Sequence, residues 1–143
     1  MLLNGSCHCA NISFRLDWQS EPTEIPARAC TCSFCLKHRG VWTSCRTGTI
    51  EVEIRDKTQV SGYTFGTKTA VFHVCSRCGA VPVVTSEIAG NTYAVVSVNA
   101  LDGVDLALLK LGQVSFDDED EATRLARRAK GWIPNVRFRV GET

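Results

Sequence analysis

Seven of the eight cysteines in this 143-residue sequence fall into three short clusters. The clusters are Cys7-His8-Cys9, Cys30-Thr31-Cys32-Ser33-Phe34-Cys35 and Cys75-Ser76-Arg77-Cys78. A structural zinc ion takes four protein ligands, often thiolates, whereas a zinc ion that must hold a reacting molecule takes three. The spacing therefore indicates metal binding, and the function depends on how the seven ligands are divided.

Two of the clusters are pairs, and neither pair can complete a tetrahedral site alone. In an extended segment residues i and i+2 share a face, so Cys7 and Cys9 can bind one ion together. Cys75 and Cys78 flank a turn, where Gly79 can take the positive φ that points backbone N–H groups at the thiolates. We predict that both pairs form one closed, structural zinc site, whose binding free energy contributes to folding.

Cys30, Cys32 and Cys35 remain, close enough in sequence to bind one ion from a single loop. Three protein ligands would leave the fourth position of this ion open to a small molecule. The spacing also permits a fourth protein ligand that closes the site. The candidates for that ligand are Cys45, His8, His38 and His73. Each has a simpler role as well, because Cys45 could be a buried apolar thiol and the histidines could be ordinary loop or strand residues.

An open site with three thiolates attracts a thiol, and coordination removes the proton of that thiol. The resulting sulfur nucleophile could attack a small aldehyde, and the reverse reaction is carbon–sulfur cleavage. His38 or Lys37 could donate a hydrogen bond to a ligand sulfur or to the developing alkoxide.

Other residues could line a pocket over the triad or bind a substrate. The aromatic candidates, which could equally pack in the core, are Trp42, Tyr63 and Phe65. The basic candidates for the carboxylates of a glutathione-like substrate, which could equally be solvated, are Arg28, Lys37 and Lys68.

The segments that must position these cysteines are predicted to be mainly β-strands. Apolar and polar residues alternate with period two in residues 10–18 and 49–56. The inward-facing residues would be Ile12, Phe14, Leu16, Ile50, Val52 and Ile54. Residues 69–74, 80–84 and 91–100 are rich in valine and threonine and also favour strands.

One helix is predicted late in the chain, over residues 117–131. Asp118 and Glu121 have the spacing of a capping box, and Gly131 can end the helix in the left-handed conformation. Its thin apolar stripe, which should face the protein, consists of Ala122, Leu125, Ala126 and Ala129. The basic residues of its last turns, Arg127, Arg128 and Lys130, are then expected to form a solvated face rather than a binding patch.

The composition is that of a globular protein, with 44% hydrophobic residues, 22% charged residues and a formal net charge of +1. This length suits a single domain over residues 1–143. The balanced charge predicts neither a nucleic-acid nor a membrane partner. The first residues do not form a signal peptide, so we expect a cytoplasmic protein whose cysteines bind metal rather than form disulfides.

Five motifs extend through most of the chain. They are GSCHC at 5–9, CTCSFC at 30–35 followed by Lys37 and Gly40, YTFGT at 63–67, HVCSRCG at 73–79 and SVNALDG at 97–103. With these motifs in this order, the chain resembles the glutathione-dependent formaldehyde-activating enzyme family, which also includes the centromere protein V type.

The resemblance implies a mainly β fold, a β-tent of small antiparallel sheets around two zinc sites, with a short C-terminal helix. It implies that Cys7, Cys9, Cys75 and Cys78 hold a structural zinc ion and that Cys30, Cys32 and Cys35 hold a catalytic one. It also implies a carbon–sulfur lyase that, like S-(hydroxymethyl)glutathione synthase, joins glutathione and formaldehyde. A non-enzymatic zinc-binding interaction module is the alternative function.

Overall fold

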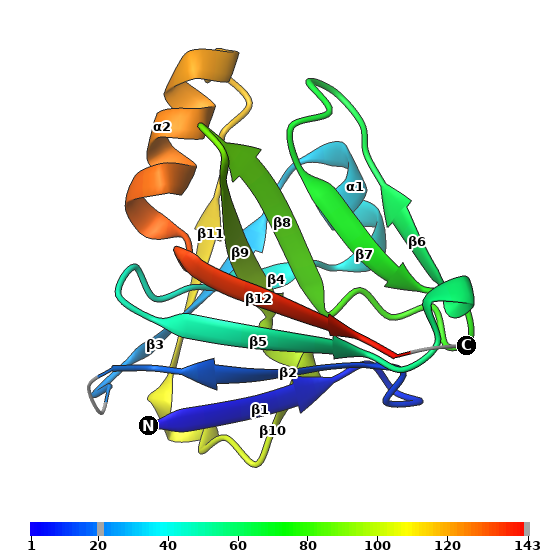
Figure 1. Cartoon of the computed structure of the whole chain (residues 1–143). Coiled ribbons are helices and arrows are strands. Elements are labelled where there is room, and N and C mark those ends of the chain that lie inside the picture. The colour runs from blue at the N-terminus through cyan, green and yellow to red at the C-terminus, as the bar shows by residue number, and fades with distance from the viewer. Residues whose placement is uncertain (20–21, 142–143) are drawn as a thin grey trace.

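The computed structural model of this chain describes residues 1–19 and 22–141, and it is mainly β, as predicted (Figure 1). Two sheets, of five and seven strands, cross one another and enclose the core between them. Among the helices of the described residues, none is both long and apolar enough to cross a membrane.

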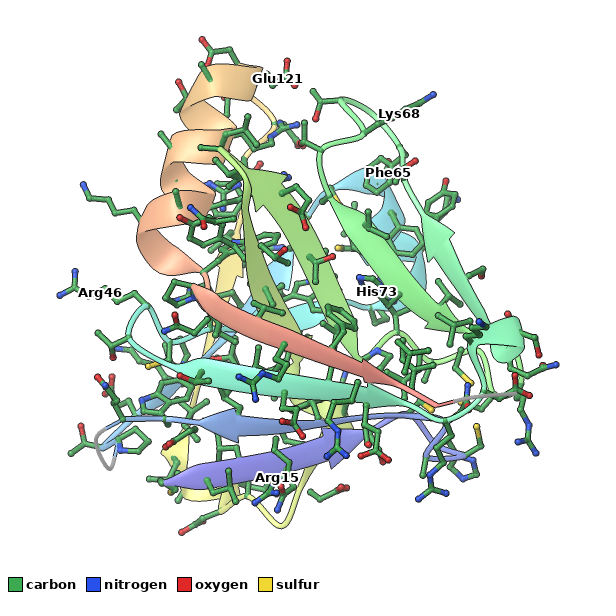
Figure 2. All side chains as sticks on the ribbon, in the orientation of Figure 1. Arg15, Arg46, Phe65, Lys68, His73 and Glu121 are labelled. Carbon is green, nitrogen blue, oxygen red and sulfur yellow. The ribbon has the colours of Figure 1, made fainter. Side chains whose placement is uncertain are left out.

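The five-stranded sheet has the order β10-β1-β2-β5-β12. Its strands are β1 (Leu2–Ser6), β2 (Ile12–Asp17), β5 (Thr49–Ile54), β10 (Leu101–Asp102) and β12 (Asn135–Val140). The predicted alternation is confirmed, because Phe14 and Val52 lie opposite one another and are buried, whereas Arg15 is exposed (Figure 2). Gly5 of β1 lies opposite Phe14 of β2. A Cβ atom at residue 5 would lie 2.3 Å from the Phe14 ring, so only glycine leaves room for this ring.

The seven-stranded sheet has the order β11-β3-β4-β9-β8-β7-β6. Its strands are β3 (Ile25–Cys30), β4 (Val41–Thr43), β6 (Val60–Tyr63), β7 (Val71–Cys75), β8 (Val83–Ile88), β9 (Asn91–Ser97) and β11 (Leu109–Val114). The sheets are not purely antiparallel, since β11 pairs with β3 and β12 pairs with β5 in parallel. Both β11 and β12 come from the last third of the chain. Each is an edge strand that pairs with a strand formed by an earlier part of the chain.

Two α-helices, α1 (Ser33–His38) and α2 (Glu121–Gly131), accompany the sheets. Three short 3-10 helices also occur: η1 (Lys57–Gln59), η2 (Val98–Ala100) and η3 (Leu106–Leu108). The predicted late helix exists, but it is not the C-terminal element, because β12 follows it. Its capping also differs from the prediction: Asp120, not Asp118, is the N-cap and accepts the backbone N–H of Thr123 at 2.8 Å. The chain leaves the helix through extended Trp132, so Gly131 is not left-handed.

The face that α2 turns toward the protein differs from the predicted one and includes only Leu125 of the expected stripe. The three alanines of the expected apolar stripe, Ala122, Ala126 and Ala129, are exposed. Arg128 is buried instead, and Arg124, Leu125 and Arg127 are half-buried. The physical reason lies in the neighbouring sheet, where Ser86 of β8 and Thr69 offer hydroxyl groups to the Arg128 guanidinium.

Candidate metal centres

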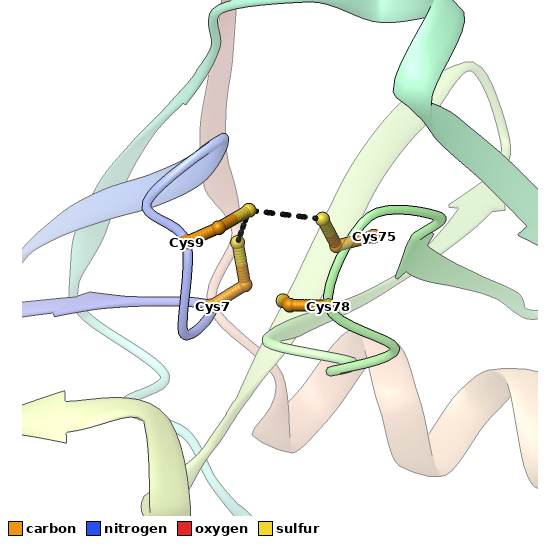
Figure 3. A group of neighbouring side chains, drawn as sticks. All are labelled: Cys7, Cys9, Cys75 and Cys78. Atoms are coloured by element: carbon orange, nitrogen blue, oxygen red, sulfur yellow. Dashed lines mark hydrogen bonds between the residues drawn. The ribbon is translucent and has the colours of Figure 1, made fainter.

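Two loops that are far apart in the sequence bring four cysteines together (Figure 3). Cys7 and Cys9 lie in the connection between β1 and β2, Cys75 ends β7, and Cys78 lies in the turn that follows. Their four Sγ atoms lie within 4.8 Å of one another, with 3.8 Å between Cys7 and Cys9 and 3.5 Å between Cys9 and Cys75. A tetrahedral zinc ion with Zn–S bonds of about 2.3 Å needs sulfurs about 3.8 Å apart, so this donor set fits that ion.

Local backbone geometry holds both pairs. The Cys7 Sγ accepts the backbone N–H of Ile12 at 3.3 Å. Gly79 takes the predicted positive φ of 80°, and its N–H donates to the Cys75 carbonyl at 2.7 Å. Burial raises the pKa of the Cys7 thiol to about 12. Four neighbouring thiolates also repel one another, so they can coexist here only beside a cation that offsets their charge.

The second cluster lies where β3 leads into α1. Cys30 is the last residue of β3, Cys32 is the N-cap of α1, and Cys35 lies within that helix. Their three Sγ atoms lie within 4.8 Å of one another, as a metal site requires. No fourth Cys, His, Asp or Glu of the described residues joins this group. The structure therefore brings together the predicted sets of four and three, and each set could hold a metal ion.

Each sulfur of the triad accepts one N–H group. The backbone N–H of Cys32 donates to the Cys30 Sγ at 3.5 Å, and that of Cys35 donates to the Cys32 Sγ at 3.4 Å. The third donor is the indole Nε1–H of Trp42, which reaches the Cys35 Sγ at 3.4 Å. A hydrogen bond from the Cys35 thiol lowers the pKa of Cys30 to about 6 and raises the pKa of Cys35.

The candidates for a fourth triad ligand all lie elsewhere. His8 is exposed, and the ring of exposed His38 packs on Phe34 at 4.2 Å between centroids. His73 Nε2 is hydrogen-bonded to the Thr85 hydroxyl at 2.7 Å. Cys45 belongs to neither cluster, and it is only partly buried, so the prediction of a buried thiol was too strong. The side chain that donates to a triad sulfur is Trp42, and not His38 or Lys37. Trp42 lies seven residues beyond Cys35, and this spacing does not indicate a contact between the two.

A cavity of about 580 Å³ opens beside the triad, within the usual size range of ligand sites. All three triad cysteines line it, and its aromatic wall consists of Trp42, Phe65, Phe72, Phe116 and Trp132. Of the predicted pocket residues, Trp42, Phe65 and Arg28 therefore lie at the cavity. Tyr63, Lys37 and Lys68 do not line it, and Lys68 points away from the molecule at the tip of its loop (Figure 2).

Three arginines of α2 also line the cavity: Arg124, Arg127 and Arg128. Sequence reasoning placed this helix's basic residues in solvent because its alanines form the only apolar stripe. The signal that could have located them is their spacing. Residues i, i+3 and i+4 share one helix face, so Arg124, Arg127 and Arg128 must point in similar directions.

The family model described as "Glutathione-dependent formaldehyde-activating enzyme" matches residues 2–110, which include every residue of both cysteine groups. No curated protein sequence matches this chain. A crystal structure of a Rhodobacter sphaeroides protein, a structural genomics target, is similar in fold, with a TM-score of 0.56 and 23% sequence identity. The similarity covers 78% of this chain and 99% of that one. Helix α2 lies beyond the residues that the family model matches.

Proposed function

Because this chain belongs to the glutathione-dependent formaldehyde-activating enzyme family, we propose that it is a zinc-dependent carbon–sulfur lyase. It would join a thiol to a small aldehyde and split the adduct again, as S-(hydroxymethyl)glutathione synthase does with glutathione and formaldehyde. The observation that carries this proposal is the placement of Cys30, Cys32 and Cys35. Their sulfurs lie within 4.8 Å of one another and line a cavity large enough for both substrates.

In this proposal Cys30, Cys32 and Cys35 are ligands of one zinc ion and not nucleophiles. When bound, that ion would supply the positive charge that keeps a substrate thiol in its thiolate form at neutral pH. The chain's own groups orient the ligands, since each sulfur is fixed by one N–H donor. Trp42 and Phe72, which are both buried, form part of an apolar wall beside the triad.

The reaction needs no oxidant and no reductant. The substrate sulfur attacks the carbonyl carbon of the aldehyde, so that a carbon–sulfur bond forms and the carbonyl π electrons move to oxygen. The oxygen then takes up the proton that the thiol has lost, which gives a hydroxymethyl thioether. The negative charge that develops on the reacting atoms is favoured by the arginines of the cavity wall.

The four-cysteine group has a different part in the proposal. Cys7, Cys9, Cys75 and Cys78 would hold a structural zinc ion, because they form a closed set. Cys7 and Cys9 lie in the connection between β1 and β2 of the five-stranded sheet. Cys75 is the last residue of β7 in the seven-stranded sheet, and Cys78 lies in the turn after it. This ion would therefore tie the two sheets together, and the chain would hold two zinc ions.

NMR exchange spectroscopy with glutathione and formaldehyde tests the proposal. Since the adduct also forms spontaneously, the measured quantity is the exchange rate above the protein-free rate. We expect the wild-type chain to accelerate exchange, Cys32→Ser to abolish the acceleration, and Cys45→Ser, which alters a cysteine outside both groups, to retain it. A folded, zinc-loaded wild-type chain without any acceleration would leave the non-enzymatic interaction module as the better reading.

A further inference from the structure

Arg128 is a buried cation that contacts no carboxylate of the described residues. Its side chain leaves α2 and lines the cavity, and the residue is only 8% exposed. One terminal nitrogen, Nη1, donates to the Thr69 hydroxyl at 2.9 Å and to the Ser86 hydroxyl at 3.2 Å. The Nε–H is buried and has no hydrogen-bond partner within the described chain. No carboxylate among the described residues lies within 4.0 Å of this guanidinium.

The neighbouring arginines of α2 are satisfied within the chain. Arg127 binds both carboxylate oxygens of Glu119, at 2.9 and 3.0 Å, and its guanidinium packs over the Phe116 ring. Arg124 lies 3.9 Å from the same carboxylate and also donates to the Phe116 carbonyl. Glu119 thus contacts both Arg127 and Arg124, whereas no carboxylate in residues 1–19 and 22–141 contacts Arg128.

A second cation that forms no ion pair within the described part of the chain lines the same cavity. Arg28 of β3 donates only to the Ser44 hydroxyl, at 3.4 Å, among the described residues. The cavity wall holds four arginines and one carboxylate, that of Asp117, which accepts the Ser115 hydroxyl at 3.3 Å. The wall therefore carries an excess of positive charge.

Burying these positive charges without an anion is unfavourable, because each guanidinium stays protonated and its charge loses the stabilisation that water provides. Burial and the nearby charges of Arg127 and Arg124 lower the pKa of Arg128 to about 10, against a smaller opposing effect of Glu119. A bound anion would supply the acceptor for Nε and reduce the repulsion among the arginines. A carboxylate matches best, since its two oxygens fit the planar fork of a guanidinium.

We infer that Arg128 and Arg28 form an anion subsite that holds a carboxylate of the thiol substrate, so that the protein selects acidic thiols over neutral ones. This inference rests on the proposed function for the place of the sulfur. Arg28 and Cys30 are two residues apart on β3 and line the same cavity, which separates their Cα atoms by about 6.6 Å. A thiol at the triad can therefore place a carboxylate a few bonds away toward Arg28, and Arg128 lines the same cavity.

Isothermal titration calorimetry of the zinc-loaded chain, with no aldehyde present, tests the subsite. The ligands are 3-mercaptopropionate, its sulfonate counterpart 2-mercaptoethanesulfonate, and neutral 2-mercaptoethanol. We expect 3-mercaptopropionate to bind roughly 10- to 100-fold more tightly than 2-mercaptoethanol, as hydrogen bonds to charged groups predict. The sulfonate should bind more weakly than the carboxylate, because it lacks the planar two-oxygen geometry.

Three variants locate the preference. Arg128→Gln and Arg28→Gln should each weaken 3-mercaptopropionate binding about tenfold or more and leave 2-mercaptoethanol binding unchanged. Lys130→Gln is the matched control, since it removes the same charge from an exposed residue of α2 that does not line the cavity. Arg28→Gln decides the question if Arg128→Gln does not fold, because Arg28 is only half-buried.

The outcomes separate the subsite from the proposed function. Equal affinity of the wild-type chain for the acidic and neutral thiols would overturn the subsite, even if adduct exchange is accelerated. An equal loss in Lys130→Gln would also overturn it, because the effect would then be one of general charge. A preference for the acidic thiol that depends on Arg28 and Arg128, without accelerated exchange, would support the subsite and contradict the lyase.

Discussion

The indole Nε1 of Trp42 lies 3.4 Å from the Sγ of Cys35 and donates to it, which connects β4 of the large sheet to the cysteine triad. Both residues are buried, and the pair also packs with Phe72 in the smaller of the two apolar clusters. The indole therefore has two tasks, because it fills the core and it orients one sulfur of the candidate metal site.

Trp42→Phe should weaken metal retention at the triad while the chain stays folded. The substitution keeps an aromatic ring but removes the hydrogen bond to Cys35, and loss of such a donor typically lowers metal affinity 10- to 100-fold. Competition with a chromophoric chelator measures the change. Trp18→Phe is the control, since Trp18 is equally buried, at 8% exposure, but packs in the other apolar cluster. A similar loss of affinity in both variants would contradict the role of the indole N–H.

Gly40→Ala should disturb the triad through Trp42. A Cβ at Gly40 would lie 2.8 Å from the Trp42 Nε1 and 3.1 Å from the Cys35 Sγ, so the donor and acceptor of this hydrogen bond would have to move apart. We expect a loss of about 1–3 kcal/mol in the free energy of unfolding, typical of overpacking, and faster release of metal from the triad. Urea denaturation and chelator kinetics provide the two readouts.

The matched control for Gly40→Ala is Gly112→Ala in β11, where a Cβ would meet no atom within 4 Å and φ is not positive. This variant should keep the metal-release rate of the wild-type chain. Unchanged release in Gly40→Ala would mean that the close approach of Gly40 to Trp42 does not position the sulfur.

Chelation should remove two metal ions per chain in two separate phases. The ion at Cys30, Cys32 and Cys35 is expected to leave first, because these residues lie in one six-residue stretch at the junction of β3 and α1 and line an open cavity. The ion at the four-cysteine group should leave later and together with the fold. Metal analysis and circular dichroism, measured along the same chelator titration, check the order.

Two cysteine variants test the same division of tasks. Cys78→Ser should prevent cooperative folding, because it breaks the group that joins the β1–β2 connection to the end of β7. Cys32→Ser should leave the thermal transition nearly unchanged. If both substitutions unfold the chain to the same extent, the two groups do not have separate roles.

Ile133→Ala should loosen the connection between α2 and the sheets. Ile133 is fully buried, and its backbone exchanges two hydrogen bonds with Ala94 of β9, at 2.9 and 3.0 Å. Deleting its buried methyl groups is expected to cost about 2–5 kcal/mol of the free energy of unfolding, as measured by urea denaturation. Leu111→Ala, at a residue that is 79% exposed, should have almost no effect. Equal costs for both would show that burial does not govern this region.

The cysteine partition could be predicted from the sequence because ligand type and spacing are local properties. Cys7 with Cys9 and Cys75 with Cys78 each need a partner pair, and the structure places the two pairs together. The strands around Phe14 and Val52 could be predicted for a similar reason, since their alternation has the period of a half-buried strand. Strand β12 carries the same signal in residues 135–140, and its alternation could have revealed it.

What the sequence could not reveal depends on contacts between distant segments. The inward face of α2 follows from the hydroxyl groups that Thr69 and Ser86 present to Arg128, and these lie 59 and 42 residues away in the chain. The parallel pairing of β12 with β5 is also non-local, because no feature of either strand specifies its neighbour. The hydrogen bond from Trp42 to Cys35 depends in turn on how β4 and α1 pack.

The parallel position of β12 beside β5 has a consequence for how the chain can be shortened. A fragment that stops at residue 110, where the family match ends, would lack both β12 and most of β11. The outer edges of β5 and β3 would then carry unpaired N–H and C=O groups, which invite pairing with another chain. The segment that follows the family match thus also covers an edge of each sheet and removes these pairing sites.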